Sequence, residues 1–198
     1  NDLVPFDSGI IRLDGIPIYD PQFGKRELYK RVGIVFQAFN LFPHMTVLDN
    51  ITLSPRRVHK IARVSAEEHA NELLALFGLD RFAGSYPEQL SGGQQQRVAI
   101  VRAMANRPDV LMLDEVTAAL DPELIGDVLS VIRDLKDRGM TMLIVTHEMG
   151  FARDVADRVC FLDGGKILED STPQKLFKDP ENPRTRQFLQ RIIDAGRL

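Results

Sequence analysis

The sequence predicts an α/β fold in which parallel strands form an open sheet with helices on its faces. The apolar runs at 110–113 and 140–145 are nearly continuous, which is typical of parallel strands buried on both faces. Between them lies a helical stripe of aliphatic side chains that ends at Gly139. Open sheets of this kind bind ligands at the carboxyl ends of their strands. The pattern therefore predicts both the fold class and the edge where a site should lie.

The elements that precede this unit follow from local patterns. The segment 9–18 is typical of a hairpin that turns at Asp14 and Gly15, and "VGIVF" (32–36) predicts another core strand. No strand pattern occurs between about 38 and 103, so we expect an inserted helical subdomain there. Within it, Ser65 and Glu68 have the spacing of a capping box at the start of a helix.

The elements that follow position 145 alternate in the same way. We expect a helix at about 148–156, then a strand at 158–162 that the turn 163–166 reverses into a hairpin. Two short helices should occupy about 173–198. The single cysteine, Cys160, lies within the strand-like run, which favours a buried thiol over a metal ligand or redox group.

Composition excludes several functional classes. A length of 198 residues suits one domain, and a net charge of −3 argues against nucleic acid as the main partner. The basic cluster at 56–63 has the character of a solvated helix face. No apolar run approaches the ~20 residues of a membrane span, and no signal peptide opens the sequence. We therefore expect a soluble intracellular protein.

Polar side chains follow the ends of three predicted strands. Asp114 and Glu115 end "VLMLDE", His147 ends "TMLIVTH", and Gln37 follows "VGIVF". Asp114 could hold a Mg²⁺ shell and Glu115 could polarise a water for attack on phosphorus. One acid could instead cap the next helix, and a lone histidine is more often structural. The convergence of all three strand ends on one edge favours a catalytic site.

The stretch "LSGGQQQR" (90–97) places a serine and two glycines ahead of a helix, an arrangement that exposes backbone N–H groups to a phosphate. No Lys-Ser or Lys-Thr follows, as a P-loop would require. Two interpretations remain at this point. Either the turn binds a phosphate in a site completed by another subunit, or Ser91 only caps the helix and the glycines only permit the turn.

These motifs together resemble the ABC ATPases. "LSGGQQQR" is similar to their signature motif, "VLMLDE" to their Walker B strand and "ALD" (119–121) to their D-loop, while Gln37 and His147 match the Q-loop glutamine and the switch histidine. The resemblance covers essentially all of residues 1–198 and implies a P-loop NTPase (ABC ATPase) fold with an inserted helical subdomain. The stretches at 41–51, 146–159 and 184–189 most resemble the ATPases of polar amino acid importers.

The resemblance implies a role for each strand-end residue. Asp114 would hold the Mg²⁺ hydration shell and Glu115 would orient the attacking water. His147 would contact the γ-phosphate of ATP. Gln37 would sense the metal ion and link the site to the membrane partner. Val116 departs from the family, which usually has proline after the glutamate, so only the rigidity of this loop differs.

The resemblance also implies a site shared by two subunits. The turn residues Ser91, Gly92, Gly93 and Gln94 would face the γ-phosphate of the nucleotide bound by the opposite subunit, and Asp121 would bridge the two subunits. The implied assembly is a homodimer on a membrane permease, served indirectly by a substrate-binding protein. It would lie peripherally on the cytoplasmic face of the inner membrane and power amino acid import with ATP and Mg²⁺.

One part of the family pattern is missing from these 198 residues. No G-x-x-x-x-G-K-[ST] motif occurs, and the sequence opens on Asn1 rather than Met. We therefore expect an N-terminally truncated domain without its first strands and P-loop, inactive on its own. The alternatives are a non-catalytic remnant that only contacts a transporter partner, and a soluble ABC ATPase that acts on DNA or ribosomes.

Overall fold

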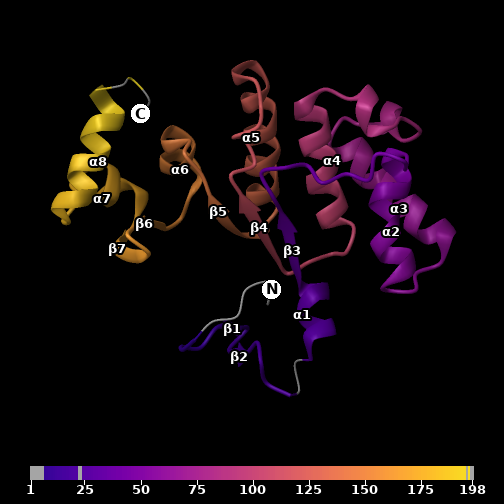
Figure 1. Ribbon diagram of the computed structural model, residues 1–198, viewed down its shortest axis with the longest axis horizontal. Helices are drawn as coiled ribbons and strands as arrows, with labels where there is room; N and C mark the ends of the chain where they lie inside the picture. The colour runs from indigo at the N-terminus through magenta and orange to yellow at the C-terminus, as the bar shows by residue number, and fades with distance from the viewer. Residues whose placement is uncertain (1–6, 22–23, 195, 197–198) are drawn as a thin grey trace. The chain divides into compact units, whose positions relative to one another are not determined.

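The computed structural model describes residues 7–21, 24–194 and 196 (Figure 1). The chain divides into two compact units, Asn1–Val145 and Thr146–Leu198, which are described here one at a time. In the part of the chain that the structure describes, no helix combines the length and the apolar character needed to cross a membrane.

The first unit is built on a three-stranded parallel sheet with the order β3-β4-β5. Its strands are β3 (Val32–Val35), β4 (Val110–Asp114) and β5 (Thr141–Val145). Val35 pairs with Leu113, and Asp114 pairs with Val145, so the carboxyl ends of all three strands lie at one edge. The three strands predicted from the apolar runs are confirmed. Their register places the residues that follow β3, β4 and β5 at the same edge of the sheet.

Helices pack on part of this sheet and against one another (Figure 1). Leu143 and Val145 of β5 are exposed, so the expected burial of this strand on both faces is wrong. The helices are α2 (Val47–Arg57), α3 (Arg63–Leu76), α4 (Gly92–Met104) and α5 (Pro122–Asp137), with the 3₁₀ turns η1 (Asp80–Phe82) and η2 (Pro87–Gln89). α2, α3 and α4 pack against one another, and α4 also packs against β3 and α5. Ile51, Leu74 and Ile100 are wholly buried between these helices. α4 is thus the element that connects the helical cluster to the sheet.

One helix start differs from the sequence prediction. α3 begins at Arg63, its N-cap residue is Ala62, and no side chain caps it. The capping box predicted for Ser65 and Glu68 is therefore wrong. Packing of the buried Ala66 and Ala70 fixes the position of this helix, and the helix extends past the serine because nothing in its first turn interrupts it.

The N-terminal hairpin predicted at Asp14 and Gly15 is present. β1 (Arg12–Leu13) pairs antiparallel with β2 (Ile16–Pro17). Asp14 and Gly15 have φ angles of 50° and 78°, the left-handed conformation that a two-residue hairpin turn of this type requires. Helix α1 (Lys25–Arg31) leads from the hairpin into β3, and Arg31 forms ion pairs with Asp14 and Asp109.

The second unit contains a β-hairpin and three helices. Its elements are α6 (Met149–Val155), β6 (Val159–Asp163), β7 (Lys166–Ser171), α7 (Pro173–Lys178) and α8 (Pro183–Asp194). Leu176, Phe177 and Leu189 are buried, with Phe161 and Phe188 packed against them. Cys160 is exposed, which corrects the expected buried thiol. The helices cover one face of β6, and Cys160 lies on the alternate side of the strand.

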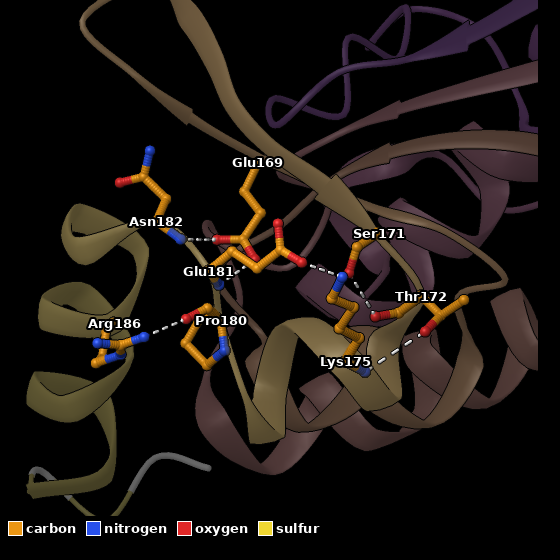
Figure 2. Close-up of polar contacts among 8 residues, drawn as sticks. All are labelled: Glu169, Ser171, Thr172, Lys175, Pro180, Glu181, Asn182 and Arg186. Atoms are coloured by element: carbon orange, nitrogen blue, oxygen red, sulfur yellow. Dashed lines mark hydrogen bonds and ion pairs between the residues drawn. The ribbon is translucent and has the colours of Figure 1, made fainter.

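A polar cluster joins the hairpin of the second unit to the start of α8 (Figure 2). The Glu169 carboxylate accepts hydrogen bonds from the N–H groups of Glu181 (2.8 Å) and Asn182 (3.1 Å). Lys175 pairs with Glu181, and Arg186 donates to the carbonyl of Pro180 at 2.8 Å. Glu169 therefore anchors the loop that leads into α8.

This anchor predicts acid sensitivity of the second unit. Partial burial acts to raise the pKa of Glu169, but the hydrogen bonds from the N–H groups of Glu181 and Asn182 outweigh it and lower the pKa. The folded state thus favours the carboxylate. Its stabilising contribution is fully present above the pKa of Glu169 in the unfolded chain and is lost as pH falls through the lower pKa of the folded state. Glu169→Gln should cost about 1 kcal/mol near neutral pH, after solvent screening, and reduce the acid dependence.

The measurement is the urea concentration at which the second unit is half unfolded. A fluorophore attached to Cys160, the single cysteine, reports this unfolding. Glu181→Gln is the matched control, since it removes an exposed carboxylate that pairs with Lys175 of the neighbouring helix α7 and leaves the N–H that bonds to Glu169 in place. An equal fall of the midpoint with acid in wild type and Glu169→Gln would contradict the anchoring role.

Candidate active site

The carboxyl edge of the sheet carries the acidic pair and the glutamine-bearing loop. Asp114 is the last residue of β4, and Glu115 follows it directly. β3 ends at Val35, so Gln37 lies two residues beyond the same edge. Gln37 and Asp114 are exposed, and Glu115 is half-buried. These side chains are accessible at the edge where open α/β sheets bind their ligands.

The donor set at this edge fits one kind of metal ion. Asp114 offers a carboxylate, a hard oxygen ligand that suits Mg²⁺. Among the described residues, no group of three or more His, Cys, Asp or Glu side chains could hold a metal ion. Mg²⁺ often takes only one or two carboxylates and completes its shell with waters and phosphate oxygens. The residues therefore fit an ion that binds together with a phosphate ligand.

Glu115 has a strained backbone. Its φ angle is 46°, in the left-handed region that non-glycine residues rarely adopt. Its N–H donates to the carbonyl of Val145 at 3.0 Å, and its carbonyl accepts from Ala118 at 3.0 Å. Strain of this kind costs on the order of 1–3 kcal/mol, persists only where neighbours fix it, and clusters at active sites. Nothing in the sequence indicates this conformation.

The turn at 91–94 is a reciprocal cap at the start of α4. The Ser91 hydroxyl accepts a hydrogen bond from the N–H of Gln94 at 3.3 Å, and the Gln94 side chain accepts from the N–H of Ser91 at 2.9 Å. Because the hydroxyl oxygen acts as an acceptor here, its proton can still be donated to another group. The N–H groups of Gly92 and Gly93 lie in the first turn of α4, where no carbonyl of the helix can accept a hydrogen bond from them. The turn therefore caps its helix and still offers donors to an anion.

Close packing requires a glycine at position 93 but leaves room for a Cβ atom at position 92. Neither glycine has a positive φ angle. A Cβ atom at Gly93 would lie 3.2 Å from Cβ of Leu124, and one at Gly92 would lie 3.4 Å from Leu120 and 3.6 Å from the ring of Phe39. Gly93 therefore also lets Leu124 approach α4 closely, in addition to its place in the turn.

Asp121 and His147 occupy different settings. Asp121 is the N-cap residue of α5, its side chain makes no capping hydrogen bond, and it is exposed beside the segment that packs on the glycines. Val116, where the family usually has proline, is buried. His147 follows β5 by two residues but belongs to the second unit, where it is exposed and its carbonyl accepts a hydrogen bond from Met149 at 3.1 Å.

The sequence analysis missed two residues that hold the loop after β3. Gln96 is wholly buried, and its Nε2 donates to the carbonyl of Phe36 at 3.4 Å. Arg102 donates to the carbonyls of Phe39 at 3.0 Å and Asn40 at 2.5 Å. The available signal was Arg102 itself, a charged residue inside the apolar stretch "VAIVRAMA".

Several ATP-binding proteins of bacterial transporters are similar to this chain. The glutamine transport ATP-binding protein GlnQ of Geobacillus stearothermophilus is 48% identical over 194 residues, covering 98% of this chain and 80% of that protein. The glutamate/aspartate import ATP-binding protein GltL of Escherichia coli K12 is 49% identical over 193 residues, with the same coverage. The L-cystine transport system ATP-binding protein TcyN of Escherichia coli K12 is 57% identical over 168 residues, covering 85% of this chain and 67% of that protein.

A family profile and a solved structure agree with these relatives. The profile described as ABC transporter matches residues 2–118. The dimeric structure of the ATP-binding cassette MJ0796, in a post-hydrolysis state with ADP and Pi, aligns with a TM-score of 0.70 and 34% identity over 84% of this chain and 74% of that one. The chain therefore belongs to the ABC transporter family and has the P-loop NTPase fold of that family's ATPases.

Proposed function

We propose that this protein is the ATP-binding and ATP-hydrolysing subunit of an importer for polar amino acids. The observation that carries the proposal is the edge of the sheet, where Asp114 and the strained Glu115 follow β4 and Gln37 follows the adjacent β3. Family membership supplies the reaction class, and the relatives named for glutamine, glutamate/aspartate and cystine supply the substrate class.

In this proposal the chain's own residues divide the work at the γ-phosphate. Asp114 holds the hydration shell of Mg²⁺, and that ion, when bound, neutralises charge that develops on the phosphate oxygens. Glu115 accepts the proton of the attacking water, with its carboxylate directed by the fixed backbone. Gln37 contacts the ion from the loop after β3, and His147 contacts the γ-phosphate.

The turn at 91–94 acts across a homodimer interface. It offers a serine hydroxyl, glycine N–H groups and the positive end of the α4 dipole, yet it has no lysine. A lysine supplied by a P-loop of the opposite subunit would complete such a site. Asp121, exposed beside this turn, bridges the two subunits. The dimeric state of the MJ0796 neighbour with ADP and Pi supports this arrangement.

The remaining assembly follows from the importer relatives. A membrane permease is the partner of this subunit, linked to the site through the Gln37 loop, and a substrate-binding protein delivers the amino acid to the permease. The C-terminal helices, about residues 173–198, complete the ATPase domain. The subunit lies peripherally on the cytoplasmic face of the cell membrane.

Deletion of the gene in its host tests this function. Uptake of at least one of labelled glutamine, glutamate, aspartate or cystine should fall to the background level, because the importer loses its energy source. The natural full-length gene should restore uptake, whereas the same gene carrying Asp114→Asn should not. Unchanged uptake of all four amino acids after deletion would contradict the substrate class. Restoration by both genes would contradict the catalytic role and favour a non-catalytic partner.

A further inference from the structure

The loop that carries Gln37 is held mainly by one helix. After β3, residues 36–40 run without regular structure, and Asn40 has a left-handed φ angle of 51°. Three carbonyls of this loop accept hydrogen bonds from α4 side chains, those of Phe36, Phe39 and Asn40. Because a loop without its own ladder of hydrogen bonds depends on such partners for its conformation, α4 determines where Gln37 lies.

The same helix begins at the candidate phosphate-binding turn. Gly92 is the first residue of α4, and its open side faces the ring of Phe39, with 3.6 Å between Phe39 Cζ and the position of a Cβ. Gln96 lies one turn further along, and Arg102 lies near the C-terminal end. The loop therefore contacts α4 over most of the helix, from the turn to its last residues.

Arg102 is the strongest of these contacts. Its guanidinium forms two hydrogen bonds to adjacent carbonyls, the forked geometry that arginine provides and lysine does not. Arg102 is half-buried, and this burial lowers the pKa of its guanidinium. Removing the charged guanidinium from water costs free energy, and only carbonyl groups compensate it here. We therefore expect Arg102 to have a specific structural role.

We propose that Arg102 is a positioning residue that fixes the Gln37 loop to α4, so that the phosphate-binding turn and Gln37 keep one mutual geometry. Arg102 touches neither nucleotide nor partner in this role and acts through the backbone of Phe39 and Asn40. The inference rests on the proposed function for its effect on turnover. Its structural part concerns the loop alone.

Arg102→Met in the natural full-length protein tests the proposal. Methionine retains most of the apolar stem and removes both hydrogen bonds. We expect kcat for ATP to fall by about 10- to 100-fold, since small misplacements of a catalytic group have effects of this size, while KM changes by less than about threefold. Amide hydrogen exchange at Phe42, whose N–H donates to Asn50 Oδ1 at 2.8 Å directly after the loop, should accelerate by about tenfold or more without ATP, because the loop opens more often once the Arg102 bonds are lost.

Arg133→Met is the matched control, because Arg133 is an exposed arginine on α5. It should change neither kcat nor amide exchange at Phe42. Arg102→Lys should restore part of both properties, since one ammonium group can reach one carbonyl. If Arg102→Met does not fold, Arg102→Lys is compared with wild type in the same two measurements.

A purely structural role predicts a different result. Arg102→Met would then lower the melting temperature, but kcat per folded molecule and amide exchange at Phe42 would match the Arg133→Met control, and the proposal would be wrong. If the wild type hydrolyses no ATP, the proposed function fails. The exchange measurement still decides whether Arg102 fixes the loop.

Discussion

Glu115→Gln is expected to bind MgATP with little change in affinity while turnover falls by about 10²-fold or more, the usual loss when a general base is removed. Glutamine retains the size and one hydrogen-bonding oxygen of Glu115 but cannot accept the proton of the attacking water. The strained backbone at this position should persist, because the bonds to Val145 and Ala118 involve main-chain atoms only. A closed dimer with uncleaved ATP should therefore accumulate.

The measurement is phosphate release and size-exclusion chromatography of the natural full-length protein with MgATP. Glu123→Gln is the matched control, since Glu123 is an exposed glutamate in the first turn of α5. That variant should retain normal turnover. Near-normal turnover in Glu115→Gln would move the catalytic base to His147 or to another group.

Gly92→Asp should abolish ATP-dependent dimerisation and hydrolysis while the monomer still binds ATP. The substitution adds a negative charge beside the N–H groups of Gly92 and Gly93, where a γ-phosphate from the opposite subunit would bind. Repulsion between this carboxylate and the phosphate opposes closure of the interface. Binding of ATP to the open monomer does not involve the turn, so its affinity should change little.

Gly92→Ala separates charge from bulk in this experiment. A Cβ at this position lies 3.4 Å from Leu120 and 3.6 Å from Phe39, which are ordinary van der Waals contacts. Alanine should therefore be accommodated and keep much of the dimerisation that aspartate removes. Loss of ATP binding by the Gly92→Asp monomer, or dimerisation at the wild-type level, would show that the turn does not act across the interface.

The elements that were predicted well are those whose signal is local. The apolar runs identified β3, β4 and β5, and the left-handed turns at 14–15 and 163–166 identified the two hairpins. The predictions that failed depended on surroundings. Ser65 has the right spacing for a cap but lies inside α3, and Cys160 lies in an apolar strand whose side opposite the helices is exposed. The order of residues in a strand or helix does not show which other elements pack against each of its faces.

The sequence by itself determined the family, the parallel strands and the residue types at the strand ends, because motif order and hydrophobic periodicity are properties of the chain alone. Only the tertiary structure decided how these residues are held. The positive φ angle of Glu115 depends on its bond to β5, and Gly93 is needed because Leu124 approaches α4. Arg102 reaches carbonyls that lie more than sixty positions earlier in the sequence. These contacts join residues distant along the chain, and the free energy that fixes them comes from packing and backbone hydrogen bonds that exist only after folding.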